Sequence, residues 1–337
     1  MNKELYQKEI NAFDFDLSPI EGRSLMISGA TGMIASYLID CIMVKGIDCR
    51  VIALGRSVEK ARTRFREYFD RENFVFYTCD INRPIDINEK ADYIIHSASN
   101  THPLAYSTDP IGTITANVIG LQNLLDYACV HDNKRFVFLS SVEVYGENRG
   151  DVESFSEDYC GYINSNTLRA GYPESKRVGE ALCQAYIKQK GMDIVIPRLS
   201  RVFGPTLLKT DTKALSQFLH KAIAGENIVL KSAGTQFYSY LYVEDIVTGI
   251  LTCLFKGNNG EAYNVADDSC NITLKDLAGT IASIAGTKVV FEIPDETEKA
   301  GYSTATKAIL SSEKINGLGW KAKYDIKQGI EKTLQCI

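Results

Sequence analysis

The chain has 337 residues, of which 45% are hydrophobic, so it can bury a sizeable core in one or two domains. Its 37 basic and 42 acidic residues give a net charge of −5 without a basic stripe, which argues against nucleic-acid binding through phosphate neutralisation. The first 23 residues lack the apolar core of a signal peptide. No apolar run reaches the ~18 residues of a membrane helix, so we expect a cytoplasmic protein that does not contact membranes.

The cysteines and histidines do not suggest a metal site. The nine cysteines are an odd number, occur singly and form no CxxC pair, which is typical of reduced core residues. None of the four histidines stands at a metal-ligand spacing from another histidine or cysteine. We therefore expect neither metal catalysis nor a Ser-His-Asp nucleophile.

Short apolar runs rich in β-formers alternate with helical patterns along the first part of the chain. The predicted strands are Ser24–Ser28, Arg50–Leu54, Phe74–Cys79, Tyr93–His96, Phe136–Ser140 and Ile194–Arg198. Helical periodicity lies between them at Met33–Lys45, Val58–Phe69 and Thr113–Cys129. This alternation predicts an α/β fold of the Rossmann type, a doubly wound parallel sheet whose ligand crevice lies at the carboxyl ends of its strands.

The pattern changes after Arg198, where longer polar loops separate a helix at Ala214–Gly225, a strand at Ile228–Leu230 and a helix at Leu274–Ala285. The segment Tyr240–Phe255 is apolar and helical enough to return to the first domain. We therefore predict an N-terminal extension (1–23), a dinucleotide-binding domain (24–198, with 240–256 returning to it) and a smaller, interleaved substrate-binding region (199–239 and 257–337).

A small-residue turn follows the first predicted strand, with Gly29, Gly32 and Ala35 in the spacing GxxGxxA. Gly29 allows a sharp turn, Gly32 lets the backbone approach phosphates, and Ala35 lets the next helix pack closely on the strand. The N-terminus of that helix offers N–H groups and a positive dipole end to an anion. The turn indicates a pyrophosphate site, although an ordinary tight turn can have the same residues.

The segment YPESK places Tyr172 and Lys176 one helical turn apart on the same face. An ammonium beside a phenol favours the phenolate and so lowers the pKa of the tyrosine, as a general base requires. Tyr186 and Lys190 repeat the spacing further along the same helical pattern. We interpret that second pair as a coincidence.

The segment SSVEVYG (140–146) follows the fifth predicted strand directly. A hydroxyl at such a strand end points into the crevice, so Ser141 can hydrogen-bond the substrate oxygen that Tyr172 deprotonates. Glu143, two residues on, would face the same way. A polar loop without a chemical role would look similar, but the combination with Tyr172 and Lys176 favours an active site.

Several motifs occur together in the order found in the extended short-chain dehydrogenase/reductases, which the chain resembles over nearly all residues after 23. The motifs are GATGxxA from residue 29, Asp80-Ile81, HSAS from residue 96, Asn117, SSVEVYG, YPESK and RVFGP from residue 201. The resemblance implies an NAD(P)-binding enzyme that modifies nucleotide-activated sugars. It also implies that Ser141, Tyr172 and Lys176 form the catalytic triad.

Within that family, the run from His96 to Thr113 is most similar to UDP-glucuronate decarboxylases, and Glu143 fits both those enzymes and sugar 4,6-dehydratases. The resemblance implies that hydride leaves the sugar C4 for the nicotinamide while Tyr172 takes the hydroxyl proton. The resulting 4-ketone acidifies the C5–H and labilises a C5 carboxylate, so loss of water or of carbon dioxide can follow. Glu143 is our candidate for handling the proton at that stage, and epimerisation stays open.

Two departures from this family concern the substrate. Arg201 stands where relatives tend to place an asparagine, and Tyr238 stands where they usually place a diphosphate-binding arginine that decarboxylases also use near the reacting sugar. A guanidinium from either wall of the site can hold a phosphate, so the two changes can compensate. They can equally indicate a differently shaped substrate, and the fate of the keto intermediate stays open.

A third departure concerns the cofactor. The second predicted strand ends in Gly55-Arg56, where an NAD-preferring site usually has an acidic residue and where an arginine suits a 2′-phosphate. The sequence therefore leaves NAD and NADP open. We expect the substrate to contact Thr101, Arg201 and Tyr238, and the cofactor to contact Gly29, Thr31, Gly32, Met33, Ile34, Arg56, Asp80, Ile81, Ser97, Ala98, Ser99, Asn117, Ser140, Tyr172 and Lys176.

Two other functions would use parts of the same site. An NADPH-dependent carbonyl reductase would need Ser141, Tyr172 and Lys176 but would leave Glu143 without a proton to move. A regulator that only binds dinucleotide would need neither Tyr172 nor Lys176. The helices Thr113–Cys129 and Tyr172–Lys190 have apolar residues on more than one face, which fits a homodimer built on a four-helix seam, as in the family.

Overall fold

The computed structural model of the chain describes residues 2–101, 106, 108–208, 211–292 and 306–337. Its helices are α1 (Lys3–Asn11), α2 (Met33–Val44), α3 (Val58–Arg64), α5 (Pro110–Val130), α6 (Gly171–Lys190), α7 (Ala214–Ile223), α8 (Val243–Lys256), α9 (Leu274–Ala285), α11 (Glu313–Asn316) and α12 (Ile326–Cys336). Its strands are β1 (Arg23–Ser28), β2 (Cys49–Gly55), β3 (Phe74–Thr78), β4 (Tyr93–His96), β5 (Arg135–Phe138), β6 (Ser140–Ser141), β7 (Ile194–Leu199), β8 (Arg201–Phe203), β9 (Ile228–Leu230), β10 (Phe237–Tyr242), β11 (Ala262–Val265), β12 (Asn271–Thr273), β13 (Val289–Phe291) and β14 (Lys307–Ala308).

A parallel sheet forms the larger part of the molecule, in the order β11-β7-β5-β4-β1-β2-β3, with β6 pairing beside β7. The chain runs outward from β1 to β3 and then crosses to β4 on the other side of β1. The point where the strand order reverses therefore lies between β1 and β4, at the end of the glycine turn. Open α/β sheets bind their ligands in the crevice at this position, and the predicted doubly wound sheet is confirmed.

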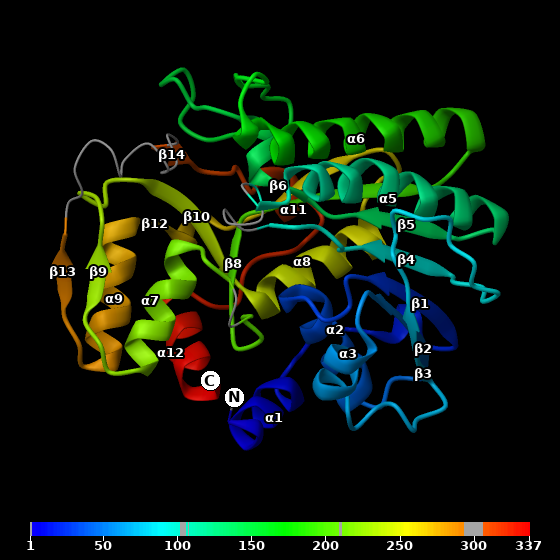
Figure 1. The fold of residues 1–337 in the computed structure, drawn as a ribbon, viewed down its shortest axis with the longest axis horizontal. Coiled ribbons are helices and arrows are strands. Elements are labelled where there is room, and N and C mark those ends of the chain that lie inside the picture. The colour runs from blue at the N-terminus through cyan, green and yellow to red at the C-terminus, as the bar shows by residue number, and fades with distance from the viewer. Residues whose placement is uncertain (1, 102–105, 107, 209–210, 293–305) are drawn as a thin grey trace.

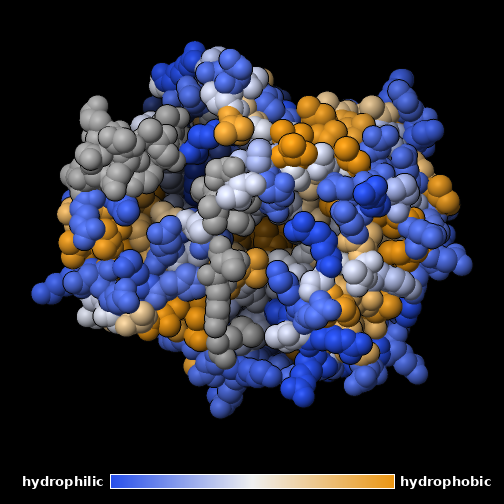
Figure 2. Space-filling view, in the orientation of Figure 1, coloured by the Kyte–Doolittle hydropathy of each residue, from blue (hydrophilic) through white to orange (hydrophobic). Residues whose placement is uncertain are grey.

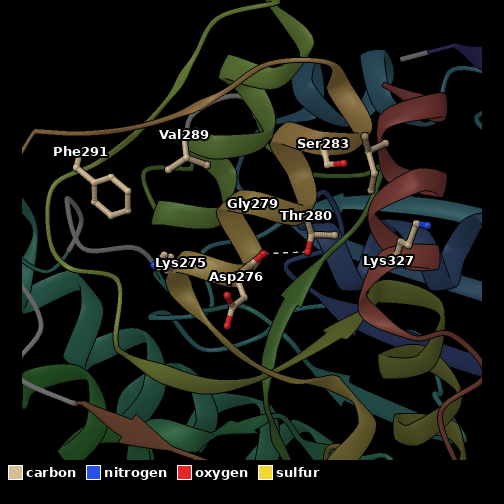
Figure 3. Close-up of a pocket in the computed structure, with 9 residues that line it drawn as sticks. Lys275, Asp276, Gly279, Thr280, Ser283, Val289, Phe291 and Lys327 are labelled. Carbon is tan, nitrogen blue, oxygen red and sulfur yellow. Dashed lines mark hydrogen bonds between the residues drawn. The ribbon is translucent and has the colours of Figure 1, made fainter.

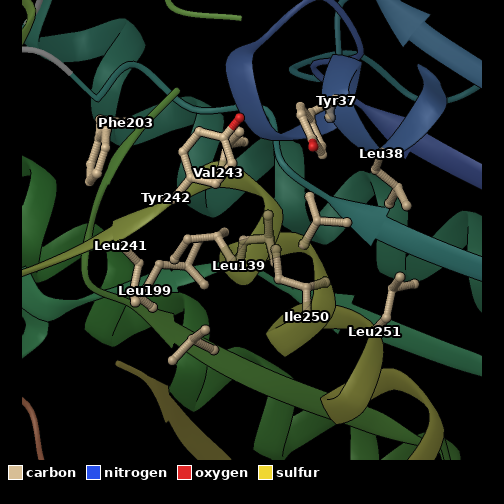
Figure 4. Packing of buried hydrophobic residues seen from close by; sticks show 14 of the residues in the cluster. Tyr37, Leu38, Leu139, Leu199, Phe203, Leu241, Tyr242, Val243, Ile250 and Leu251 are labelled. Carbon is tan, nitrogen blue, oxygen red and sulfur yellow. The ribbon is translucent and has the colours of Figure 1, made fainter. Parts of the chain in front are cut away.

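Helices cover both faces of this sheet: α5 and α6 lie together on one face, and α2 and α8 lie on the other (Figure 1). Alternate residues of β1 serve the two faces, because Leu25 and Ile27 join one hydrophobic cluster and Met26 joins the other. Figure 4 shows the first cluster, where Tyr37 and Leu38 of α2 face Ile250 and Leu251 of α8. Burial on both faces fixes the register of the sheet.

A smaller region carries the sheet β12-β10-β14, the parallel pair β9 and β13, and helices α7, α9 and α12 (Figure 1). Strand β8 pairs in parallel with β10 and so connects this region to the end of β7. Helix α8 follows β10 and packs on α2 and β7. Strand β11 pairs with β7, so residues 262–265, which the sequence assigned to the substrate-binding region, form an edge strand of the large sheet.

The N-terminal helix α1 lies between the two regions, and Figure 1 shows both chain ends close together beside it. Tyr6 donates a hydrogen bond from its hydroxyl to Asp40 of α2 (2.5 Å), and Arg64 of α3 forms an ion pair with the same buried carboxylate. On its other side, Glu9 accepts two hydrogen bonds of 2.7 Å from Lys332 of α12. The extension therefore ties the helices of the large sheet to the last helix of the chain.

Three predicted elements were wrong in part. The predicted strand Phe136–Ser140 breaks at Leu139, because residues 140–141 leave β5 and pair with β7. Helix α3 ends at Arg64, since the apolar residues beyond it form an aromatic cluster in turns, with Tyr68 and Phe69 against Phe74. The segment predicted as helical from Tyr240 instead begins as the end of β10, and α8 starts at Val243.

Candidate active site

The glycine turn between β1 and α2 has the geometry of a phosphate cradle. Gly29 has a φ of 68°, and a Cβ there would lie 2.8 Å from the Cα of Ala98. Gly32 is the N-cap of α2 and makes no side-chain capping hydrogen bond, so no N-cap side chain occupies the N–H groups of the first turn. Thr31, Met33 and Ile34 are partly exposed around it. Because a Cβ would fill this space, the residues fit a dinucleotide pyrophosphate.

Hydrogen bonds of the Ser28 hydroxyl connect the end of β1 to the end of β4. Ser28 accepts hydrogen bonds of 3.2 Å from the backbone N–H groups of both Ser97 and Ala98, and its Oγ lies 2.8 Å from Nδ1 of His96. The next hydroxyl, Ser99 Oγ, is buried without a hydrogen-bond partner among the described residues. A ligand in the crevice can supply its missing partner.

His96 stays neutral because it is buried. Burial, followed by the nearby charge of Lys176, lowers the pKa of His96 from 6.5 to about 3. In the unfolded chain the imidazole regains its ordinary pKa and binds a proton below pH 6.5. The unfolded state then holds more protons than the folded state, so the free energy of unfolding falls as the pH drops through this window.

We expect this histidine to cost about 2 kcal/mol of stability between pH 6.5 and pH 5, at about 1.4 kcal/mol per pH unit. Urea unfolding of the wild type and of a His96→Gln variant at both pH values measures the difference. The variant should lose less stability on acidification than the wild type. An equal loss in the two proteins would mean that His96 is already protonated in the folded state.

The residues predicted to contact the adenosine end of the cofactor lie at the carboxyl ends of β2 and β3. Arg56 follows β2 and is exposed. Asp80 is exposed and accepts a hydrogen bond from the N–H of Asn82, while Ile81 is buried against Gly120 of α5. The parallel pairing of β2 with β3 brings these positions to one edge of the sheet.

Ser141 of β6 lies beside Tyr172 at the start of α6, and Lys176 follows one turn later on the same helix. The Ser141 hydroxyl accepts a hydrogen bond of 3.3 Å from the N–H of Glu143 and lies close enough to Tyr172 to lower the pKa of its phenol. Lys176 is buried, donates a hydrogen bond of 2.7 Å to the carbonyl oxygen of Leu139, and lies 4.6 Å from the ring centroid of Phe138. Tyr186, the tyrosine of the second YxxxK pair, instead donates a hydrogen bond to Asp126 outside this site.

The pKa values of this group differ from the expectation. Burial raises the pKa of Tyr172 above its usual value, Ser141 lowers it, and the charge of Glu143 raises it again. Burial also lowers the pKa of Lys176 to about 7. The expected lowering of the tyrosine pKa by Lys176 is therefore absent from the protein alone, because both groups are desolvated and the ammonium is directed at a backbone carbonyl.

Two residues that were predicted to contact the cofactor, Asn117 and Ser140, form hydrogen bonds to side chains of α6. Asn117 of α5 is fully buried and donates a hydrogen bond of 3.0 Å to Ser175, while its carbonyl oxygen has no partner among the described residues. Ser140 donates a hydrogen bond of 2.6 Å to Glu180, which also pairs with Arg198. Both hydrogen bonds hold α6, and hence Tyr172, in place.

The opposite wall of the site comes from β8 and β10. Arg201 lies with its guanidinium carbon 3.6 Å from the ring centroid of Tyr238, and its Nη2 is 3.5 Å from Glu143. Nη1 of Arg201 is buried with no partner among the described residues. Thr101 is exposed and accepts a hydrogen bond of 3.4 Å from Lys213. Figure 3 shows a separate groove over α9, and none of the predicted site residues lines it.

The sequence predictions missed two groups in this site. Tyr106 stacks on Tyr172, with ring centroids 5.1 Å apart and ring planes 20° apart. Lys213 lies within 3.8 Å of Asp211 and reaches Thr101. Tyr106 lies in the run from His96 to Thr113 that resembles UDP-glucuronate decarboxylases, although it was not predicted as a site residue, whereas Lys213 belongs to no motif and only the folded chain places it here. Among the described residues, no three His, Cys, Asp or Glu side chains are grouped closely enough to hold a metal ion.

Comparisons with known proteins identify the family of the chain. Residues 25–266 match the NAD dependent epimerase/dehydratase family. The chain is 29% identical over 323 residues to UDP-glucuronic acid decarboxylase 1 of Danio rerio, covering 95% of this chain and 73% of that protein. It is also 29% identical over 310 residues to UDP-glucuronic acid decarboxylase 3 of Arabidopsis thaliana, covering 91% of this chain and 86% of that protein.

Solved structures share the fold. A dTDP-glucose 4,6-dehydratase from Streptomyces venezuelae, crystallised with NAD, superposes with a TM-score of 0.79 at 22% identity, covering 93% of this chain and 96% of that one. The fold and site thus define an NAD-dependent enzyme of the extended short-chain dehydrogenase type. The chain belongs to the NAD dependent epimerase/dehydratase family. No helix among the described residues is both long enough and apolar enough to span a membrane.

Proposed function

We propose that this enzyme modifies a nucleotide sugar by transient oxidation at C4. The observation that carries the proposal is the placement of Ser141 beside the buried Tyr172 at the carboxyl edge of the same sheet that carries the glycine turn. Bound NAD would supply the hydride acceptor, held by Gly29, Gly32 and the N-terminus of α2. The unpartnered Ser99 hydroxyl and Asn117 carbonyl fit a polar ligand there.

The side chains of the protein have separate roles in this proposal. Tyr172 takes the proton of the C4 hydroxyl as the hydride leaves C4, and Ser141 hydrogen-bonds the same oxygen. In the holoenzyme the Lys176 ammonium would favour the phenolate form of Tyr172, an effect that is absent from the protein alone. In a dehydration, the Glu143 carboxylate would remove the C5 proton of the 4-keto sugar; in a decarboxylation, its protonated form would donate a proton to C5 after carbon dioxide has left. The predicted substrate contact of Thr101 belongs to this proposal.

Mass spectrometry tests the proposal directly. The purified enzyme is heat-denatured and its released small molecules are identified. The native enzyme is then incubated with UDP-, dTDP-, CDP- and GDP-sugars without added reductant. We expect released NAD and a product that is lighter by carbon dioxide or water, or unchanged in mass after epimerisation at C4. An enzyme that is empty and silent until NADPH is added would instead be a reductase, as the exposed Arg56 would permit.

We also propose a homodimer formed through α5 and α6. Large apolar side chains stay exposed on this face, among them Ile111, Ile114 and Ile119 of α5 and Val178 of α6, and Figure 2 shows apolar residues gathered there. A second copy would bury them in a four-helix seam.

Light scattering after size-exclusion chromatography should give about twice the chain mass of 37.4 kDa for the wild type. An Ile119→Glu variant should shift toward the single-chain mass, because it would bury a charge in the seam. A Val290→Glu variant on β13, also exposed, is the control and should stay dimeric. A monomeric wild type would contradict the proposed seam.

A further inference from the structure

Arg201 is held flat against Tyr238 by the pairing of two strands. Strand β8 runs parallel to β10, with Arg201 opposite Tyr240. Tyr238 stands two residues before Tyr240, so its side chain lies on the same face of the strand, and its ring is buried under the guanidinium. The carbon-to-centroid distance of 3.6 Å is that of a close cation–π stack. The arginine and the tyrosine, both departures from the family pattern, therefore form one unit.

The edge of the same guanidinium faces the carboxylate of Glu143. Nη2 lies 3.5 Å from Oε1, and the Arg201 side chain is 23% exposed against 45% for Glu143. The charge of Glu143 also acts on Tyr172 and on Tyr106, so this carboxylate stands inside the reacting site. Arg201 therefore contacts both the buried ring of Tyr238 and Glu143, the acidic side chain that the proposed reaction uses.

We propose that Arg201, stacked on Tyr238, is a positioning residue for Glu143, and that it holds this carboxylate ready for the proton transfer at C5. The inference rests on the proposed function. A guanidinium suits this role because it stays charged and does not exchange protons with its partner. Stacking on a buried ring removes much of the freedom of a long side chain, so the carboxylate has a fixed partner.

A different role for Arg201, binding the substrate diphosphate, predicts different kinetics. Loss of a diphosphate contact weakens substrate binding and raises KM, whereas loss of a positioning contact slows a step after C4 oxidation and lowers kcat. In the second case hydride has already left C4, and only the proton transfer is delayed. Reduced nicotinamide therefore builds up during turnover, which its near-ultraviolet absorbance reports.

The experiment compares the wild-type holoenzyme with Arg201→Asn, Arg201→Lys, Tyr238→Leu and Tyr238→Phe variants, with UDP-glucuronate as the first probe and the other nucleotide sugars following. We expect Arg201→Asn and Tyr238→Leu to lower kcat about 10- to 100-fold with less than about fivefold change in KM. Both variants should accumulate reduced nicotinamide. Tyr238→Phe keeps the ring and should stay within about threefold of wild type, while Arg201→Lys keeps the charge and should restore part of the lost kcat.

Thermal unfolding of each variant is measured alongside, so that a loss of fold is not mistaken for a loss of positioning. A rise in KM at unchanged kcat, or full activity of Tyr238→Leu, would overturn the inference. So would a slow variant that shows no build-up of reduced nicotinamide. If the wild type consumes no nucleotide sugar, the proposed function itself fails, and the inference fails with it.

Discussion

Replacing Tyr172 with phenylalanine is expected to lower turnover by about 10²- to 10⁴-fold, because the variant keeps the ring but has no oxygen to take the C4 hydroxyl proton. The ring stack on Tyr106 should persist, so the substrate crevice keeps its shape. The glycine turn is untouched, so the dissociation constant for NAD should change little. Steady-state kinetics and calorimetric titration with NAD measure the two effects separately.

The chain offers a matched control for this variant on the same helix. Tyr186→Phe removes the hydroxyl of the second YxxxK tyrosine, which hydrogen-bonds only Asp126 among the described residues and lies on α6 away from the crevice. Its activity should equal that of the wild type, with a loss of about 1 kcal/mol in stability at most. Near-normal turnover of the Tyr172→Phe variant would show that Tyr172 is not the general base.

The sheet and the glycine turn could be predicted because their signals are local. Apart from the two serines of β6, each strand of the large sheet from β1 to β7 is a short apolar run, and the turn residues Gly29 and Gly32 follow the first of them. The hydrophobic periodicity of a strand and the residue preferences of a turn extend over only a few residues, so both can be recognised in a single sequence. The position of Ser141 at a strand end and the YxxxK spacing of Tyr172 and Lys176 are local signals of the same kind.

The remaining parts of the site depend on contacts between distant segments. The Arg201–Tyr238 stack follows from the register of β8 on β10, and its link to Glu143 follows from the placement of β6. The pKa of Tyr172 is set chiefly by burial, which no spacing reports. The contacts of Asp40 are also invisible to spacing, because its partners on α1 and α3 are separated from it by 34 and 24 residues. Such contacts depend on tertiary packing, which local patterns do not encode.

Introducing a methyl group at Gly29 is expected to destabilise the fold by about 2–4 kcal/mol and to weaken NAD binding at least about tenfold. Two costs add here. Alanine is strained at a φ of 68°, and its Cβ would stand 2.8 Å from the Cα of Ala98 and 2.9 Å from its nitrogen. Those atoms are backbone and are held by Ser28, so they cannot move aside without opening the junction of β1 and β4.

A Gly46→Ala variant separates the two costs. Gly46 has nearly the same φ, 66°, but nothing lies within 4 Å of its added Cβ. It should therefore lose only the strain energy, about 1–2 kcal/mol, and keep the NAD affinity of the wild type. Urea unfolding and calorimetric titration with NAD compare the two variants. Equal losses of stability, or full NAD affinity in Gly29→Ala, would show that the close approach of Gly29 to Ala98 does not shape the cofactor site. A selective loss at Gly29 would show that the phosphate cradle depends on this contact, because both variants carry the same backbone strain.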